Sequence, residues 1–248
     1  MKILLINPNV TEAVTEVMAA EARHWASPGT EIVPVTARFG ASYIETRGEA
    51  AIAAHAVLDA LAEHAAGHDA AIVSAFGDPG LAAAREVMHI PVVGIAEAAM
   101  LTAYTLGKRY AIVTMSARLA TWYRECARDH GLDGRLVAIR ALTGAIADIA
   151  NAKEELGHAV VAECLLAVEE DGAEVVIMGG GPLAGLARDA RDDIPVPVLD
   201  GVSCAVMLAE SLVRLGPRAP ERGSFAKPAS KPFEGLSPAL SALLDPDQ

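Results

Sequence analysis

Aromatic residues, positive charges and long apolar runs are all scarce in this chain of 248 residues. Aromatic residues make up 4% of the sequence, which leaves little surface on which nucleic-acid bases could stack. Lys and Arg number 20 against 32 Asp and Glu, and the net charge of −12 argues against nucleic acids and anionic membrane surfaces as partners. We therefore expect a small-molecule ligand, with no nucleic-acid and no membrane partner.

Cysteine is also rare, and the number and spacing of its residues argue against a disulfide framework and against a cysteine-rich metal site. Cys126, Cys164 and Cys204 form no Cys-x-x-Cys pair, and an odd number does not fit a disulfide framework. Cys126 and His130 lie four residues apart, but nothing nearby in the sequence completes a set of three or four metal ligands. The N-terminal apolar run is too short for a signal peptide, and no stretch approaches the ~18 apolar residues of a membrane span. These absences predict a cytoplasmic protein.

Short β-branched runs alternate with longer Ala- and Leu-rich runs, which is the pattern of βαβ units with parallel sheets. Predicted strands cover residues 2–7, 31–36, 70–75, 92–95, 110–115, 135–140, 174–179 and 196–200. Predicted helices cover residues 11–25, 47–66, 79–88, 117–130, 153–171 and 203–215. The segment DAAIVSAFGDPGLAAARE (69–86) resembles AEVVIMGGGPLAGLARDA (173–190). Strand and helix alternate in every α/β protein, but the matched turns favour an internal duplication.

The duplication predicts an α/β fold of two pseudo-symmetric lobes with parallel sheets flanked by helices. We expect residues 1–100, with the return of 203–216, to form one lobe and residues 101–202 to form the second. The site is expected in the cleft between the lobes, because such folds bind ligands at the carboxyl ends of parallel strands. Residues 217–248 are rich in Pro, Ser and Lys, which predicts an extended tail that ends in a short helix.

Two turns after predicted strands carry candidate binding groups. In INPNV, Asn7 and Asn9 offer amide groups at the carboxyl end of the first strand, although Asn and Pro also form ordinary turns. In AFGDPG (75–80), Asp78 precedes Pro79 as an N-cap would, and the backbone N–H groups of Phe76 and Gly77 can bind a carboxylate or oxyanion.

Two further segments add candidate groups. GGGPLAG (179–185) does not have the spacing of a dinucleotide loop, so its glycines are expected to let the backbone approach a small ligand. The segment 40–51 (GASYIETRGEAA) has two possible roles. It is either a solvent-exposed segment that caps the next helix, or a lid that brings Tyr43, Glu45 or Arg47 to the substrate.

Five segments of the chain resemble the hydantoin and allantoin racemases of the aspartate/glutamate racemase superfamily: INPNVTEAVT, AFGDPGLAAAREV, PVVGIAEAAM, YAIVTMSAR and VPVLDGVSCAV. The resemblance covers residues 2–215. It implies the two-lobed fold, neither an organic cofactor nor a metal, and proton exchange at a stereocentre between two cysteines on opposite faces. We also expect a homo-oligomer, between a dimer and a hexamer.

The positions that resemble the two family cysteines are Ala75 and Gly180. A methyl group and a hydrogen cannot exchange protons, so racemisation by two thiols is not available. Either the thiols were replaced deliberately, or the chain belongs to a branch without these cysteines whose chemistry has changed. The altered neighbours in SAFG and GGGP favour the second explanation.

Several binding elements of the family survive, and by resemblance they hold the carboxylate or imide of a small ligand. The predicted substrate-binding residues are Asn7, Ala75, Phe76, Gly77, Thr114, Ser116, Gly180, Gly181 and Pro182. A donor set of this kind discriminates well between rings that satisfy it and rings that do not.

A general base must replace the thiols, and a carboxylate needs burial to raise its pKa from near ~4. Glu45 is the first candidate and Asp78 the second, while Tyr43 acts as an acid or orients the ring. The sequence thus predicts an enzyme that acts on a hydantoin-, thiohydantoin- or allantoin-like cyclic ureide through an enolate. The alternatives are a ring-cleaving hydrolase or desulfurase, an arylmalonate-type decarboxylase, and a non-catalytic ligand sensor.

Overall fold

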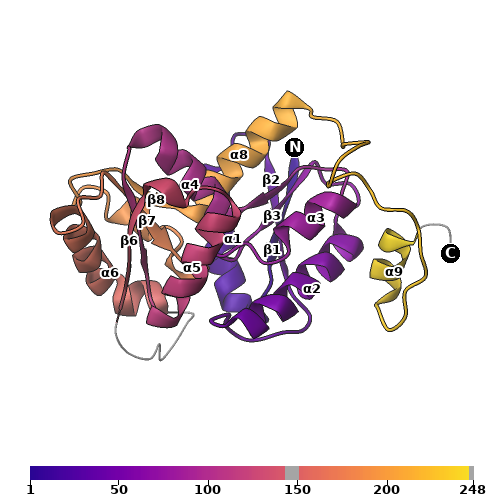
Figure 1. Ribbon diagram of the computed structural model, residues 1–248, viewed down its shortest axis with the longest axis horizontal. Helices are drawn as coiled ribbons and strands as arrows, with labels where there is room; N and C mark the ends of the chain where they lie inside the picture. Colours follow the sequence, from indigo (N-terminus) through magenta and orange to yellow (C-terminus); the bar gives the residue numbers. More distant parts are fainter. Residues whose placement is uncertain (143–150, 246–248) are drawn as a thin grey trace.

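The computed structural model describes residues 1–142 and 151–245, which form two four-stranded parallel sheets flanked by helices (Figure 1). The first sheet has the order β2-β1-β3-β4 and comprises β1 (Lys2–Asn7), β2 (Glu31–Thr36), β3 (Ala70–Val73) and β4 (Val92–Gly94). The second has the order β6-β5-β7-β8 and comprises β5 (Tyr110–Thr114), β6 (Leu136–Ala141), β7 (Val175–Gly179) and β8 (Val198–Asp200). Since both sheets have the same relative strand order, the two-lobed fold expected from the sequence is confirmed.

Helices connect the strands and cover the faces of both sheets. They are α1 (Glu12–Trp25), α2 (Arg47–His64), α3 (Leu81–Val87), α4 (Ile95–Leu106), α5 (Ala117–Asp129), α6 (Ala152–Glu169), α7 (Leu186–Asp189), α8 (Gly201–Leu215) and α9 (Pro238–Leu244). Two short 3-10 helices lie at Asp133–Arg135 and Gly181–Leu183. The predicted strands and helices agree with these bounds to within a few residues, whereas α4 and α7 were not predicted. None of the described helices is both long enough and apolar enough to span a membrane.

The start of α4 explains why sequence patterns did not reveal it. β4 runs into α4 with Gly94 as the N-cap residue, and the side-chain cap comes from Asp78, which is distant in sequence. The Asp78 carboxylate accepts hydrogen bonds from the backbone N–H of Ala96 at 3.0 Å and of Glu97 at 2.8 Å. A β-carbon at Gly94 would stand 2.3 Å from Cγ of Asp78, so only glycine leaves room for this cap.

The predicted role of Asp78 as N-cap of its own helix is therefore wrong. α3 begins at Leu81 behind Gly80, with no side-chain cap. Asp78 has a φ of 48°, and among the described residues it is the one non-glycine with a positive φ. This backbone conformation is found mainly for Gly, Asn and Asp, and here the Asp78 side chain reaches α4 instead of α3.

The largest cluster of buried apolar side chains joins the two sheets. It includes Leu5 and Ile72 from the first sheet and Ile112 and Ile177 from the second, all fully buried. α8 contributes to the same cluster and contacts β3 and β4 as well as β7 and β8. Since burial of each such side chain stabilises the fold by about 1.5–3 kcal/mol, this shared core fixes how the two sheets meet.

The chain after α8 runs along the outside of the first sheet's helices and ends in α9 (Figure 1). α9 packs against α2, with Leu240 fully buried in the contact. The short helix expected near the end of the tail is thus present, and it lies against the chain's own α2.

Candidate active site

A pocket lies where the chain leaves β3 and β7, so its walls come from both sheets. Ser74, Ala75 and Phe76 line it after β3, and Gly180, Gly181 and Pro182 line it after β7. The remaining lining residues are Asn9, Val14, Met18, Tyr43, Ile44, Trp122 and Tyr123. This is the place at which α/β folds bind ligands.

The pocket is small. Its cavity volume of about 30 Å³ is roughly the share of one water molecule in the liquid. A ring-sized ligand therefore requires wall side chains to move outward. Among these, Tyr43 and Ile44 lie on the loop before α2 and not in a strand.

No thiol lines this pocket. Ala75 and Gly180, which resemble the family's cysteine positions, both line it, while the three cysteines of the chain are buried elsewhere. Burial raises the pKa of Cys204 to about 11 and that of Cys164 to about 12, so both remain neutral thiols near pH 7. The described pocket wall offers no cysteine for proton exchange.

Phe76 and Gly181 line the pocket from its two sides, one after β3 and the other after β7. The N–H groups of Phe76 and Gly181 find no acceptor within residues 1–142 and 151–245. A β-carbon at Gly181 would stand 2.5 Å from Sδ of Met18, so any side chain at this position would require Met18 to move. Donors held by rigid turns stabilise negative charge well, because they need no reorganisation when the charge develops.

Asn9, and not Asn7, brings an amide to the pocket. The Asn7 side chain is fully buried and donates from Nδ2 to Oδ1 of Asn9 at 2.9 Å and to Oγ1 of Thr15 at 2.9 Å. Asn9 Oδ1 also accepts from the backbone N–H of Thr11 at 2.9 Å. The Nδ2 group of Asn9 has no acceptor among the described residues, which leaves it for a ligand.

Tyr43 is the tyrosine with an unused hydroxyl in the wall. This hydroxyl is buried and has no hydrogen-bond partner in the described part of the chain. Burial raises the pKa of Tyr43 and that of Tyr123, so both side chains are neutral. A neutral hydroxyl without a partner can donate a hydrogen bond to an acceptor atom of a ligand.

Glu45 lies next to the pocket but does not line it. Its backbone N–H donates to Oε2 of Glu49 at 2.7 Å, and the N–H of Thr46 donates to the same oxygen at 2.9 Å. With the Thr46 hydroxyl, Glu49 forms a capping box at the start of α2. Arg47 points away and binds Glu125 of α5 through Nε at 2.9 Å. The capping box therefore positions Tyr43 and Ile44, while Arg47 ties the loop to the second lobe.

The other predicted site residues do not line this pocket. Gly77 and Asp78 line a second cavity on the far side of the same turn. Thr114 is fully buried at the end of β5, and Ser116 is the N-cap of α5. Sequence reasoning identified the amide of Asn9 but missed Val14, Met18, Ile44, Ser74, Trp122 and Tyr123 as wall residues. Trp122 and Tyr123 lie on α5, and the sequence of this helix does not indicate which lobe it contacts.

A family model described as Asp/Glu/Hydantoin racemase matches residues 3–209. The chain belongs to this family. The resemblance expected from the Asn-Pro-Asn and Phe-Gly-Asp-Pro-Gly turns is thereby confirmed, and the family places the chain among enzymes.

Individual relatives support the same assignment. A hydantoin racemase from Pseudomonas sp. (strain NS671) is 34% identical over 236 residues, which is 95% of each chain. The allantoin racemase from Klebsiella pneumoniae has a TM-score of 0.92 and 38% identity, with 97% of this chain and 99% of that chain covered. The allantoin racemase from Pseudomonas fluorescens has a TM-score of 0.90 and 39% identity, with 95% and 100% covered.

Proposed function

We propose that the pocket binds a small cyclic ureide, of the hydantoin, thiohydantoin or allantoin type, and stabilises the enolate form of its ring. One observation carries this proposal: Phe76 and Gly181 line the same pocket from two strand ends, and their backbone N–H groups have no acceptors of their own among the described residues. Charge that develops on a ring carbonyl oxygen would find donors already in place. The hydantoin and allantoin racemases among the relatives support the substrate class.

In this proposal Tyr43 returns the proton to the ring carbon, since its hydroxyl is neutral and has no partner among the described residues. Glu45 is the base, and it reaches the ring when the loop that carries Tyr43 rearranges around the ligand. Asp78 is a weaker candidate, because its carboxylate is engaged by the start of α4 and by His130. Asn9 donates from Nδ2 to a second carbonyl of the ring.

Arylmalonate-type decarboxylation is the second candidate, favoured by the composition of the wall. Among the described residues, no Asp, Glu, His, Lys or Cys lines the pocket. Decarboxylation needs no base, because the electron pair of the broken C–C bond forms the enolate and a proton donor then completes the product. Ring hydrolysis or desulfurisation would instead need a base to activate water.

A proton NMR time course in D₂O with 5-substituted hydantoins, thiohydantoins and allantoin tests the proposal. Loss of the ring C–H signal together with loss of optical rotation supports racemisation through the enolate. Ring opening or sulfide release without exchange would assign a hydrolase or desulfurase. A parallel arm with aryl-substituted malonates reports decarboxylation as loss of the carboxylate. Perturbed shifts without turnover in any arm would contradict catalysis and leave a ligand sensor.

Location, assembly and the division of the chain remain predictions. Acidic composition and unpaired cysteines support a cytoplasmic protein, and the family resemblance supports a homo-oligomer between a dimer and a hexamer. We likewise retain lobes at residues 1–100 with 203–216 and at 101–202, followed by a tail at 217–248.

A further inference from the structure

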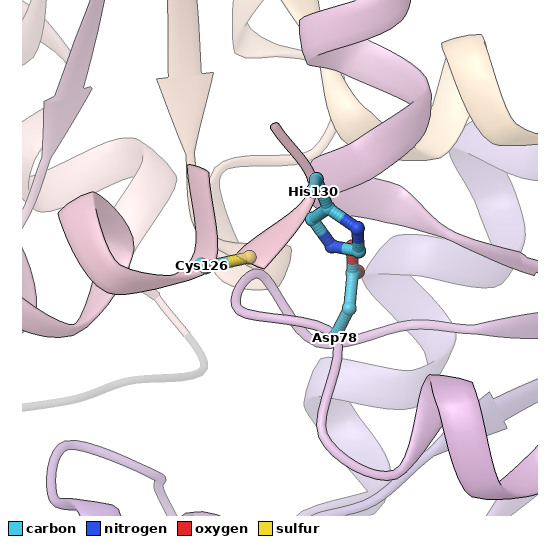
Figure 2. A group of neighbouring side chains, drawn as sticks. All are labelled: Asp78, Cys126 and His130. Atoms are coloured by element: carbon cyan, nitrogen blue, oxygen red, sulfur yellow. The ribbon is translucent and has the colours of Figure 1, made fainter. Parts of the chain in front are cut away.

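A second cavity lies behind the turn that follows β3, and it is separate from the candidate active site. Its volume is about 560 Å³, and the side chains that line it include Asp78, Cys126 and His130. Their ligand atoms all lie within 4.8 Å of one another. Figure 2 shows the Cys126 sulfur pointing toward the His130 ring, which lies against the Asp78 carboxylate. Cys126 and His130 come from the end of α5, whereas Asp78 comes from the other lobe.

We propose that Asp78, Cys126 and His130 bind a divalent transition-metal ion, with Zn²⁺ as the best match. A thiolate, an imidazole and a carboxylate are the three ligand types that Zn²⁺ takes in proteins. Three protein ligands leave a fourth position open to water from the cavity. Mg²⁺ and Ca²⁺ fit less well, because they prefer oxygen ligands alone.

Neighbouring groups already orient two of the three ligands. Glu97 places Oε1 3.7 Å from Nδ1 of His130, on the side of the ring away from Asp78, and Arg85 holds the Glu97 carboxylate with a bond of 3.0 Å to the same oxygen. The backbone N–H groups at the start of α4 fix the Asp78 carboxylate. A carboxylate behind the second nitrogen of a histidine is the usual support of a metal-binding imidazole. The guanidinium of Arg85 is neutralised by Glu97, so it adds little repulsion toward a cation.

An ion pair between His130 and Asp78 is the competing explanation for the cluster. Nε2 of His130 lies 3.1 Å from Oδ2 of Asp78, as in a simple hydrogen-bonded pair. That explanation accounts for two of the three groups and leaves Cys126 as a free thiol whose sulfur points at the pair. Burial raises the pKa of Cys126, so the ion must displace the thiol proton and the proton between His130 and Asp78. Both protons leave to solvent through the cavity.

A bound ion would connect the two lobes next to the candidate active site. Trp122 lines both the pocket at the strand ends and this cavity, and Gly77 and Asp78 belong to the turn that presents the Phe76 N–H. The ion would thus hold that turn against α5. Its role would be to stabilise this arrangement, since none of its ligands lines the candidate active site.

Titration of the metal-free full-length protein with Co²⁺, followed by absorption spectroscopy, tests the site. We expect one Co²⁺ per chain, a thiolate-to-cobalt charge-transfer band, and displacement of Co²⁺ by Zn²⁺. Cys126→Ser should lose the band, while Cys164→Ser, which removes another buried thiol, should keep it. His130→Ala should weaken Co²⁺ binding at least about tenfold, because even outer-sphere partners of metal ligands contribute that much.

Thermal unfolding keeps the test decisive even if Cys126→Ser fails to fold. The His130 side chain is 16% exposed at the edge of the cavity, so its removal is compatible with folding. Zn²⁺ should raise the Tm of the unmodified protein and of Cys164→Ser, and should leave that of His130→Ala unchanged. The proposal is overturned if the unmodified protein shows no saturable cobalt band, or if the band survives in Cys126→Ser. None of these readings depends on the proposed enzymatic activity.

Discussion

The indole of Trp122 lies directly over Gly77: a β-carbon at Gly77 would stand 2.5 Å from Cζ2 of the ring. Gly77 also has a φ of 112°, which side chains of L-residues rarely adopt. Because Trp122 comes from the second lobe and Gly77 from the first, this contact fixes the turn that presents the Phe76 N–H. Gly77 is thus required for two reasons: it allows the backbone conformation of the turn, and it leaves room for Trp122 of the other lobe.

Gly77→Ala should destabilise the protein and displace the turn. The backbone conformation alone should cost about 1–3 kcal/mol in the free energy of unfolding, and the collision with Trp122 should add to this. Urea unfolding measures the total. Gly67→Ala is the matched control, since Gly67 has a φ of 77° but nothing within 4 Å of its β-position. Equal losses in the two variants would show that the contact with Trp122 has no effect.

Tyr43→Phe should separate catalysis from stability. The Tyr43 hydroxyl is buried without a partner among the described residues, so its removal should leave stability unchanged or raise it by about 1 kcal/mol. If Tyr43 donates the proton, turnover should fall by about 10²–10⁴-fold. Thermal unfolding and the NMR assay give the two readings. A variant that is as active as the unmodified protein would remove Tyr43 from the mechanism.

Thiols placed at the two family positions should behave differently. Ala75 has an ordinary negative φ, whereas Gly180 has a φ of 141° and its β-position lies 3.2 Å from Cε of Met115. Ala75→Cys should therefore fold normally, and Gly180→Cys should lose about 1–3 kcal/mol in the free energy of unfolding. The backbone conformation at Gly180 thus favours glycine.

Alkylation followed by mass spectrometry checks the position of the new thiol. Iodoacetamide should label Ala75→Cys once, and a bound hydantoin should slow the reaction. The unmodified protein is the control, because its three cysteines are buried and should react slowly. If no ligand protects the thiol of Ala75→Cys from alkylation, substrate binding in this pocket would be contradicted.

The Glu49 carboxylate should make part of the stability depend on pH. The backbone N–H of Glu45 lowers the pKa of Glu49, partial burial opposes this, and the N–H and hydroxyl of Thr46 lower it further. In the unfolded chain the carboxyl of a Glu has a pKa of ~4.3, which is above that of Glu49 in the folded protein. The unfolded state therefore binds protons more readily, and acid destabilises the fold. The contribution of Glu49 is thus complete above about pH 5 and disappears as pH falls through its lowered folded pKa.

Glu49→Gln should reveal this contribution in urea unfolding at several pH values. At pH 6 the variant should be less stable by about 0.5–1 kcal/mol, and near pH 3 the difference should shrink. Glu86→Gln is the control, since Glu86 is exposed and its side chain makes no hydrogen bond with another described residue. A difference that stays constant from pH 6 to pH 3 would contradict the assigned shift.

The sequence by itself determined the strands, most of the helices and the repeated order of elements in this fold. The apolar run of residues 2–7 indicates a strand because a buried parallel strand needs apolar side chains on both faces. The glycines of the two matched turns also follow from local rules, since the φ values at Gly77 and Gly180 favour glycine. These features depend on a few neighbouring residues, and a local pattern is enough to indicate them.

Only the tertiary structure decided which side chains meet. Asp78 precedes a helix as an N-cap would, yet it caps α4 and lies beside His130, because α4 and α5 pack against its turn. Asn7 and Asn9 are equally polar in the sequence, but the strand buries Asn7 while the loop brings Asn9 to the pocket. Trp122 lines both the candidate active site and the cavity beside Asp78, because the two lobes pack against each other through a shared core. Such contacts join residues far apart in the chain, and the packing of the two sheets decides them, which no local pattern records.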